Sequence, residues 1–254
     1  MMDLSGKKGL VLGIANEHSI AHGCAKAFHR AGADLAITYL NSKAEPYVRP
    51  LAEQLEAALI LPCDVREAGA LESVFNAVRA EWGKIDFLLH SIAFAPKADL
   101  HARVTDCSRD GFLQAMDISC HSFIRCAKHA EPLMTEGGAL LTVTFYGSER
   151  VVANYNMMGP VKAALESSVR YLAGEMANQS IRVNAISPGP IATRAASGIA
   201  AFDEVLEESR RDTPAHRLVT IDEVGDYAAF LVSTKARGVT GNIEYVDAGL
   251  HITD

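Results

Sequence analysis

The sequence predicts an α/β fold: one domain built on a doubly wound, parallel, seven-stranded sheet with helices on both faces. Three observations predict it. Seven short runs rich in leucine and β-branched residues alternate with longer segments. The short runs are apolar at nearly every position, as expected of parallel strands covered on both sides. The longer segments carry apolar residues at the helical period.

The elements can be placed in chain order. Each expected strand is a run such as KGLVLGI or IDFLLHSIAF, and the seven span 8–14, 34–40, 58–65, 85–94, 138–146, 181–188 and 242–249. Helices are expected between them, for example at 20–32 and at 163–177, where Leu165, Val169, Leu172 and Met176 share one face. Strands that alternate with helices in this way are typical of a Rossmann-type sheet. Segment 188–212 begins Pro-Gly-Pro, and we expect it to be irregular and to form a substrate-binding lid.

Length and composition limit the class of protein. The chain has 254 residues, of which 49% are hydrophobic, so we expect a single nucleotide-binding and catalytic domain over 1–254. A net charge of −7 argues against a nucleic-acid partner. The five cysteines are scattered and form no Cys-x2-Cys pair, which favours reduced thiols and a cytoplasmic location. We see no signal peptide or membrane span, and expect no membrane partner.

The first turn after a strand is the usual phosphate site in such folds. Here the turn reads GIANEHSIAHG and lacks the G-x-G-x-x-G pattern. Gly13 permits a tight exit from the strand, and Ser19 is expected to cap the following helix and to offer a hydroxyl to a phosphate. An ordinary helix cap on a loop is the alternative.

The end of the second strand normally indicates the cofactor, through an acid for the NAD ribose or an arginine for the NADP phosphate. This chain has Leu40 and Asn41 there, which leaves both NADH and NADPH open. Asp64, after the third strand, is a candidate acceptor for an adenine amino group, although an aspartate that simply caps a strand is as common.

A set of motifs resembles the enoyl-acyl-carrier-protein reductases of bacterial type II fatty acid synthesis, a branch of the short-chain dehydrogenase/reductase superfamily. The motifs are GIANEHSIA (13–21), HSIAFAP (90–96), DISCHSF (117–123), NYNMMGPVKAALE (154–166), RVNAISPGPIAT (182–193) and AASGI (195–199). Most members of the superfamily carry Tyr-x3-Lys, whereas this chain has Tyr155 and Lys162 at the Tyr-x6-Lys spacing of the enoyl reductase branch. The resemblance extends from end to end.

The resemblance implies NAD(P)H-dependent reduction of the C2=C3 double bond of trans-2-enoyl thioesters, with NADH as the preferred cofactor. Negative charge then develops on the thioester oxygen, where a hydrogen-bond donor is needed. The resemblance assigns that role to Tyr155 and gives Lys162 the nicotinamide ribose. The charge of Lys162 is also expected to favour the deprotonated form of Tyr155.

The remaining site residues also follow from the resemblance. The implied cofactor-binding residues are Gly13, Ser19, Ile20, Asp64, Val65, Ser91, Ile92, Ala93, Lys162, Ile191 and Thr193. The implied substrate-binding residues are Phe94, Ala95, Phe145, Tyr155, Met158 and Phe202. The implied partner is an enoyl-acyl carrier protein or enoyl-CoA. A homotetramer that packs the helices at 108–133 and 155–178 is also implied.

The geometry of NYNMMGPVK supports the pairing of Tyr155 and Lys162. Seven helical positions turn the chain by about 700° and rise about 10 Å, so both residues are expected on one helix face. Pro160 suits the first turn, where amides have no intrahelical partner. The helix is therefore expected to begin near Asn156–Met157, with Tyr155 at its mouth.

The sequence departs from the family pattern at several positions. Phe145 replaces a second tyrosine of many bacterial members, Ala93 replaces a usual glycine, and Leu40 replaces a frequent polar residue. The helix on which acidic carrier protein docks is usually basic, whereas this chain has Ala200, Asp203 and Glu204. Three later arginines are the candidates for restoring a positive mouth: Arg210, Arg211 and Arg217.

Several alternatives remain open. A paralogue with weak affinity for carrier protein would act on CoA thioesters. A 3-ketoacyl or carbonyl reductase would need a further hydroxyl, for which Thr142 is the nearest candidate. A nucleotide-binding regulator would bind the cofactor without turnover. We expect no metal, because no acid or cysteine completes the pair His18 and His22.

Overall fold

The structure is a computed structural model that describes residues 2–194 and 196–253. The described residues form one seven-stranded parallel sheet in the order β3-β2-β1-β4-β5-β6-β7. The strands are β1 (Lys8–Leu12), β2 (Asp34–Tyr39), β3 (Leu59–Pro62), β4 (Phe87–His90), β5 (Gly138–Val143), β6 (Ile181–Pro188) and β7 (Ile243–Val246). The predicted fold class is confirmed. Strand β4 ends earlier than expected, because residues 91–94 leave the sheet and line a cavity.

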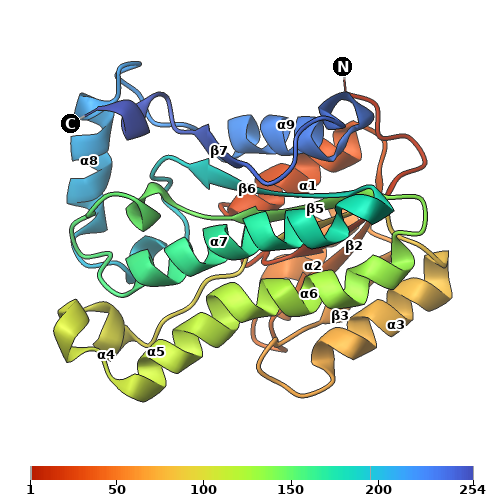
Figure 1. The fold of residues 1–254 in the computed structure, drawn as a ribbon, viewed down its shortest axis with the longest axis horizontal. Coiled ribbons are helices and arrows are strands. Elements are labelled where there is room, and N and C mark those ends of the chain that lie inside the picture. The colour runs from red at the N-terminus through yellow and green to blue at the C-terminus, as the bar shows by residue number, and fades with distance from the viewer. Residues whose placement is uncertain (1, 195, 254) are drawn as a thin grey trace.

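Helices cover both faces of this sheet (Figure 1). They are α1 (Ile20–Arg30), α2 (Glu45–Gln54), α3 (Ala70–Trp82), α4 (Lys97–Leu100), α5 (Arg109–Met116), α6 (Ser122–Ala130), α7 (Met158–Met176), α8 (Phe202–Asp212) and α9 (Ile221–Val232). A π-helical segment, Asp117–His121, joins α5 to α6.

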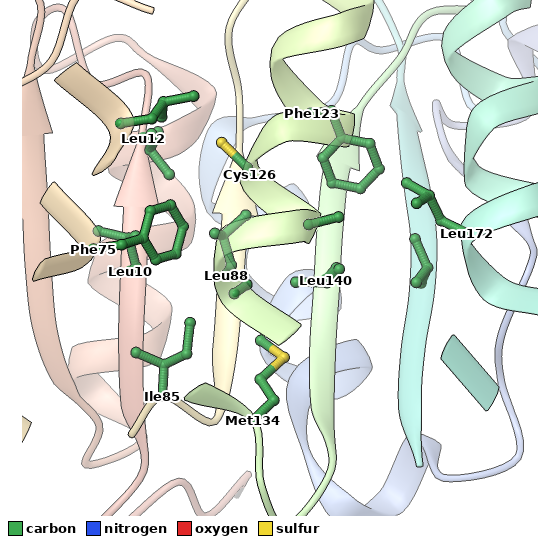
Figure 2. Close-up of a cluster of buried hydrophobic side chains, with 14 of the residues drawn as sticks. Leu10, Leu12, Phe75, Ile85, Leu88, Phe123, Cys126, Met134, Leu140 and Leu172 are labelled. Atoms are coloured by element: carbon green, nitrogen blue, oxygen red, sulfur yellow. The ribbon is translucent and has the colours of Figure 1, made fainter. Parts of the chain in front are cut away.

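The alternation of side chains along the strands divides the core into two layers. Leu10 and Leu88 point to the face covered by α3, α6 and α7, where they pack against side chains such as Phe75 and Phe123 (Figure 2). Val11 and Leu89 point to the opposite face, covered by α1, α2 and α9. Both faces are therefore buried, which explains why the strands read as nearly continuous apolar runs.

The order of the strands fixes where a ligand can bind. Strands β1 and β4 are neighbours, although the chain visits β2 and β3 between them. In doubly wound sheets a crevice opens at such a switch point, beyond the carboxyl ends of the strands. The arrowhead of β6 in Figure 1 points toward the end of the molecule where α4 and α8 lie.

The expectation of an irregular segment over 188–212 is wrong for its second half. Residues 202–212 form α8, an amphipathic helix that buries Val205 and Ser209 beneath charged neighbours. A short 3-10 turn, Ala196–Gly198, precedes it. Ala195, the first residue of AASGI, lies outside the described residues. Charged residues at helical spacing, not only Pro and Gly, decide the structure of this segment.

Candidate active site

An open cavity lies beyond the carboxyl ends of the strands. It adjoins a second cavity, and Gly13, Ser91 and Ala93 line both. Together the two are lined by all of the residues that the sequence singled out for cofactor or substrate: Gly13, Ser19, Ile20, Asp64, Val65, Ser91, Ile92, Ala93, Phe94, Ala95, Phe145, Tyr155, Met158, Lys162, Ile191, Thr193 and Phe202. Residues from seven separate segments thus meet at one groove.

Gly13 is required by the backbone at the exit of β1. Its φ of +109° is a conformation that other residues avoid. A Cβ atom at this position would lie 2.1 Å from the carbonyl oxygen of Ser91. The two loops that leave β1 and β4 can therefore approach each other only at a glycine.

Ser19 does not cap α1 with its side chain, contrary to the expectation from the sequence. Its Oγ instead accepts hydrogen bonds of 3.0 Å from the amides of Ala15 and Asn16, in the preceding loop. Within the described part of the chain, the first amides of α1, those of Ile20 and Ala21, have no hydrogen-bond partner. Such amides at a helix N-terminus suit a phosphate oxygen.

Tyr155 precedes α7 and does not lie on it. The helix begins at Met158, one residue after the expected start, and Pro160 lies in its first turn as expected. Tyr155 and Lys162 therefore do not share one helix face, contrary to the expectation from their spacing. Both side chains are nevertheless buried and line the same cavity. The turn before the helix, and not the helical period, brings Tyr155 to the site.

One hydrogen bond holds Lys162, and the charge of Glu166 acts on it. Its Nζ donates a hydrogen bond of 2.7 Å to the carbonyl oxygen of Val143 at the end of β5. Burial lowers the pKa of Lys162 to about 8, while the negative charge of Glu166 acts in the opposite direction. Glu166 is buried and accepts hydrogen bonds from Thr144, at 2.7 Å, and from Ser148, at 2.5 Å. These residues form a polar network beneath the cavity.

Tyr155 is a neutral phenol over the whole physiological range. Burial raises the pKa of Tyr155 far above its usual value, and the charge of Glu166 raises it further. Desolvation is the largest cause of this shift, and the expectation that Lys162 favours the deprotonated phenol stays a prediction. The ring of Phe145 packs edge-on against Tyr155, with centroids 5.0 Å apart, and adds to that desolvation.

The second cavity holds the residues expected at adenine. Asp64 and Val65 line it together with Leu40, whose side chain is exposed. Arg66 pairs with Asp64 at 2.6 Å and lowers the pKa of that carboxyl. Part of the acceptor capacity of Asp64 is thus used within the chain. The sequence reasoning missed Arg66, although a basic residue two positions after Asp64 was visible.

The acyl end of the first cavity is apolar. Phe94, Met158 and Phe202 line it beside Leu100 and Ile199. Phe94 is fixed through its backbone: its amide donates to the Oγ of Ser119 at 2.9 Å, and its carbonyl accepts from the same hydroxyl at 3.0 Å. Ser119 lies in the π-helical segment, and no signal in the sequence indicated this contact.

Thr142, the candidate hydroxyl for a ketone reductase, is occupied elsewhere. It is buried on the sheet face below α6, and its Oγ1 lies 3.0 Å from the Nδ1 of His90. The other ring nitrogen of His90 contacts the hydroxyl of Ser122 at 2.7 Å. Thr142 does not line the cavity, so this chain does not supply the expected third hydroxyl from that position.

The arginines proposed to restore a positive mouth are all ion-paired. Arg210 contacts Glu207 at 3.4 Å. Arg211 contacts Asp212 at 2.9 Å, and Arg217 contacts Glu223 at 2.7 Å. Since α8 also carries Asp203 and Glu204, the helix has an acidic surface.

Within residues 2–194 and 196–253, no cluster of three or more histidine, cysteine or acidic side chains is placed to bind a metal ion. Over the same residues, no helix has the length and hydrophobicity required to cross a bilayer.

Comparison with known proteins agrees with this geometry. The family described as Enoyl-(Acyl carrier protein) reductase matches residues 13–251. Enoyl-acyl-carrier-protein reductase (NADH) 2 of Rhizobium meliloti is 48% identical over 250 residues, which cover 98% of this chain and 93% of the relative.

Solved structures are similar over the same extent. The reductase of Anaplasma phagocytophilum in complex with NAD has a TM-score of 0.94 at 47% identity, covering 98% of this chain and 95% of that one. The Bacillus cereus reductase with NADP+ and an indole naphthyridinone has a TM-score of 0.96 at 48% identity, covering 99% of both chains. On these matches, the chain belongs to the enoyl-(acyl carrier protein) reductase family.

Proposed function

We propose that this protein reduces the C2=C3 double bond of trans-2-enoyl thioesters with NADH, as an enoyl-acyl-carrier-protein reductase of fatty acid synthesis. One observation carries the proposal: a neutral buried phenol, Tyr155, and a buried amine, Lys162, line the same cavity as the switch-point loops after β1 and β4. Membership of the family, and relatives that are named for NADH, support it.

The residues present fit a dinucleotide. The amides of Ile20 and Ala21 have no partner in the described chain, and Gly13 lets the loop after β1 pass close to the backbone of Ser91. These groups are suited to the pyrophosphate, and the second cavity, with Asp64 and Val65, is suited to the adenine. Leu40 offers no charge to a ribose phosphate, and Arg66 is already paired with Asp64. Both observations favour NADH over NADPH.

The mechanism divides the work between two side chains. When bound, NADH would supply the hydride for C3 of the substrate, and a proton from solvent would complete the reduction at C2. As charge develops on the thioester oxygen, the Tyr155 phenol donates a hydrogen bond to it. Lys162, fixed by the Val143 carbonyl, is placed to hold the ribose hydroxyls and to stabilise the same charge. Phe94, Met158 and Phe202 exclude water from the acyl chain.

The test is a crossed assay that follows loss of NADH or NADPH absorbance with crotonyl thioesters of carrier protein and of CoA. We expect turnover with NADH, and none with acetoacetyl thioesters, since Thr142 is turned away from the cavity. A Tyr155→Phe/Lys162→Met double variant should lose most activity. Full activity in that variant would overturn the assigned roles. Cofactor binding without turnover across the panel would favour a regulator.

A second candidate substrate is the CoA thioester. The acidic surface of α8, with its arginines paired, does not complement an acidic carrier protein, which makes the smaller CoA thioester a second candidate, although CoA is anionic as well. A kcat/KM at least as high for crotonyl-CoA as for the carrier-protein thioester would support this reading.

We also propose that segment 188–212 is a lid over the acyl end and that the protein is a homotetramer. Phe202 and Ile199, from that segment, line the cavity. In the single chain, apolar side chains on α5 and α7 are exposed, among them Leu113 and Tyr171. Sedimentation equilibrium tests the assembly.

Cysteines at 24, 63, 120 and 126 are buried and free, which suits a reducing compartment such as the cytoplasm.

A further inference from the structure

Tyr155 lies between two asparagines that both adopt the left-handed backbone conformation. Asn154 has a φ of +62° and Asn156 a φ of +44°. Asparagine tolerates this region better than most residues, because its short polar side chain bonds locally. The two left-handed residues reverse the chain on either side of Tyr155. The tyrosine ring is consequently buried, although Asn154 is exposed.

Each asparagine is also tied to a different wall of the cavity. The Nδ2 of Asn156 donates a hydrogen bond of 2.7 Å to the carbonyl oxygen of Leu100, at the end of α4. The Nδ2 of Asn154 donates one of 3.0 Å to the carbonyl oxygen of Ala200, just before α8. Leu100 itself lines the cavity. The turn that presents the phenol is thus held at both of its ends, by α4 and by the segment before α8, and these two are themselves joined by a hydrogen bond between His101 and the carbonyl oxygen of Gly198.

The two tethers differ in strength. The bond from Asn156 is partly buried, whereas the bond from Asn154 is exposed and competes with water. Tyr155 has further contacts on one side, where Gly147 packs against its ring. A Cβ atom at Gly147 would lie 2.6 Å from that ring, so the ring cannot move toward Gly147. The ring also packs against Phe145, and the tethered turn sets where its backbone lies.

We propose that Asn154 and Asn156 are positioning residues that fix the Tyr155 phenol in the acyl pocket, with Asn156 the stronger of the two. This inference rests on the proposed function, in which Tyr155 donates to the thioester oxygen. A hydrogen-bond donor in an active site must be held to within a fraction of an ångström, and a displacement of about 1 Å can cost about a hundredfold in rate.

Glycine substitutions distinguish the effect of losing the side-chain hydrogen bond from the effect of straining the left-handed backbone. Asn156→Gly permits the left-handed conformation and removes the side-chain amide, at the cost of a more flexible backbone, whereas Asn156→Ala removes the amide and strains the backbone. Ser180→Gly is the matched control, since Ser180 is exposed, has a φ of +59° and lies at the opposite end of α7. We expect kcat to fall about ten- to a hundredfold in Asn156→Gly and about threefold in Asn154→Gly.

A positioning role predicts that kcat falls while the affinity for NADH does not change. The NADH dissociation constant, measured by fluorescence, should be unchanged in Asn156→Gly, and Ser180→Gly should equal the wild type. Hydrogen exchange of the peptide over 152–158 should accelerate in Asn156→Gly, a readout that needs no turnover. If Asn156→Gly had the same kcat and the same hydrogen exchange as the wild type, the proposed tether would be overturned. An inactive wild type would instead overturn the proposed function, and the exchange experiment would still decide the tether.

Discussion

Glu166 lies one helical turn after Lys162 on α7, and its negative charge opposes the lowering of the Lys162 pKa by burial. The carboxylate is itself held by hydroxyls of Thr144 and Ser148. The charge of the proposed ribose-binding amine therefore depends on a buried acid that does not line the cavity.

Glu166→Gln should make Lys162 lose its proton at lower pH. The pKa of Lys162 is about 8, and removal of the Glu166 charge takes away its largest favourable partner. Because the charged form carries the activity, kcat/KM should fall as pH rises through about 8 in the wild type, and at lower pH in the variant. A pH profile at limiting NADH measures this. Tyr155 does not interfere, since burial keeps its pKa above this range.

Ser148→Ala is the control for that experiment. It removes one hydrogen bond to Glu166 and leaves the charge in place, so its alkaline limb should lie much nearer to that of the wild type. Identical limbs in the wild type and Glu166→Gln would contradict the coupling.

Ser19→Ala should weaken NADH binding more than it weakens the fold. The Ser19 hydroxyl holds the amides of Ala15 and Asn16 in the loop over the proposed pyrophosphate site. Thr220→Ala is the contrast, because Thr220 forms a capping box with Glu223 at the start of α9, away from the cavity. That variant should lose about 1 kcal/mol of unfolding free energy and keep its NADH affinity. Urea unfolding and cofactor titration on both variants check the prediction; equal effects would contradict it.

Gly23→Ala should destabilise the fold severely. A Cβ atom at Gly23 would lie 2.2 Å from the carbonyl oxygen of Ile221, so α1 and α9 would have to separate. Overpacking of this kind typically costs about 1–3 kcal/mol or more. Gly238→Ala provides the opposite case, since nothing lies within 4 Å of its added methyl and its φ is not positive. It should be neutral or stabilise by up to about 1 kcal/mol. Thermal denaturation compares the two, and a neutral Gly23→Ala would refute the packing argument.

The sequence predicted the sheet well because parallel strands covered on both faces need near-continuous apolar runs, and all seven are present. It also predicted which residues share a cavity, through motifs at the carboxyl ends of the strands. The sequence did not predict side-chain positions that depend on a backbone turn or on a rotamer. The position of Tyr155 depends on two left-handed asparagines, and the Ser19 hydroxyl turns back to its loop. Neither effect follows from residue spacing.

Burial was the other quantity that the sequence did not provide. Lys162 was expected to favour the deprotonated form of Tyr155, as it would in water. Both side chains are desolvated, so the pKa of Tyr155 rises while that of Lys162 falls. The pKa values at a buried site depend on solvent exclusion by residues outside the motif, such as Phe145, and the spacing of Tyr155 and Lys162 does not indicate it.

Reversing the charge on α8 should change the choice of substrate carrier. Asp203→Lys/Glu204→Lys places two cations beside Phe202, at the mouth of the cavity. If an acidic carrier protein approaches this helix, kcat/KM for its crotonyl thioester should rise about tenfold at low salt and lose the gain near 1 M salt, where screening is complete. A neutral crotonyl-pantetheine thioester should show no change. Glu72→Lys/Glu81→Lys on α3, at the other end of the molecule in Figure 1, makes the same change in net charge. An equal gain in that control would mean that net charge, and not the surface of α8, governs the encounter.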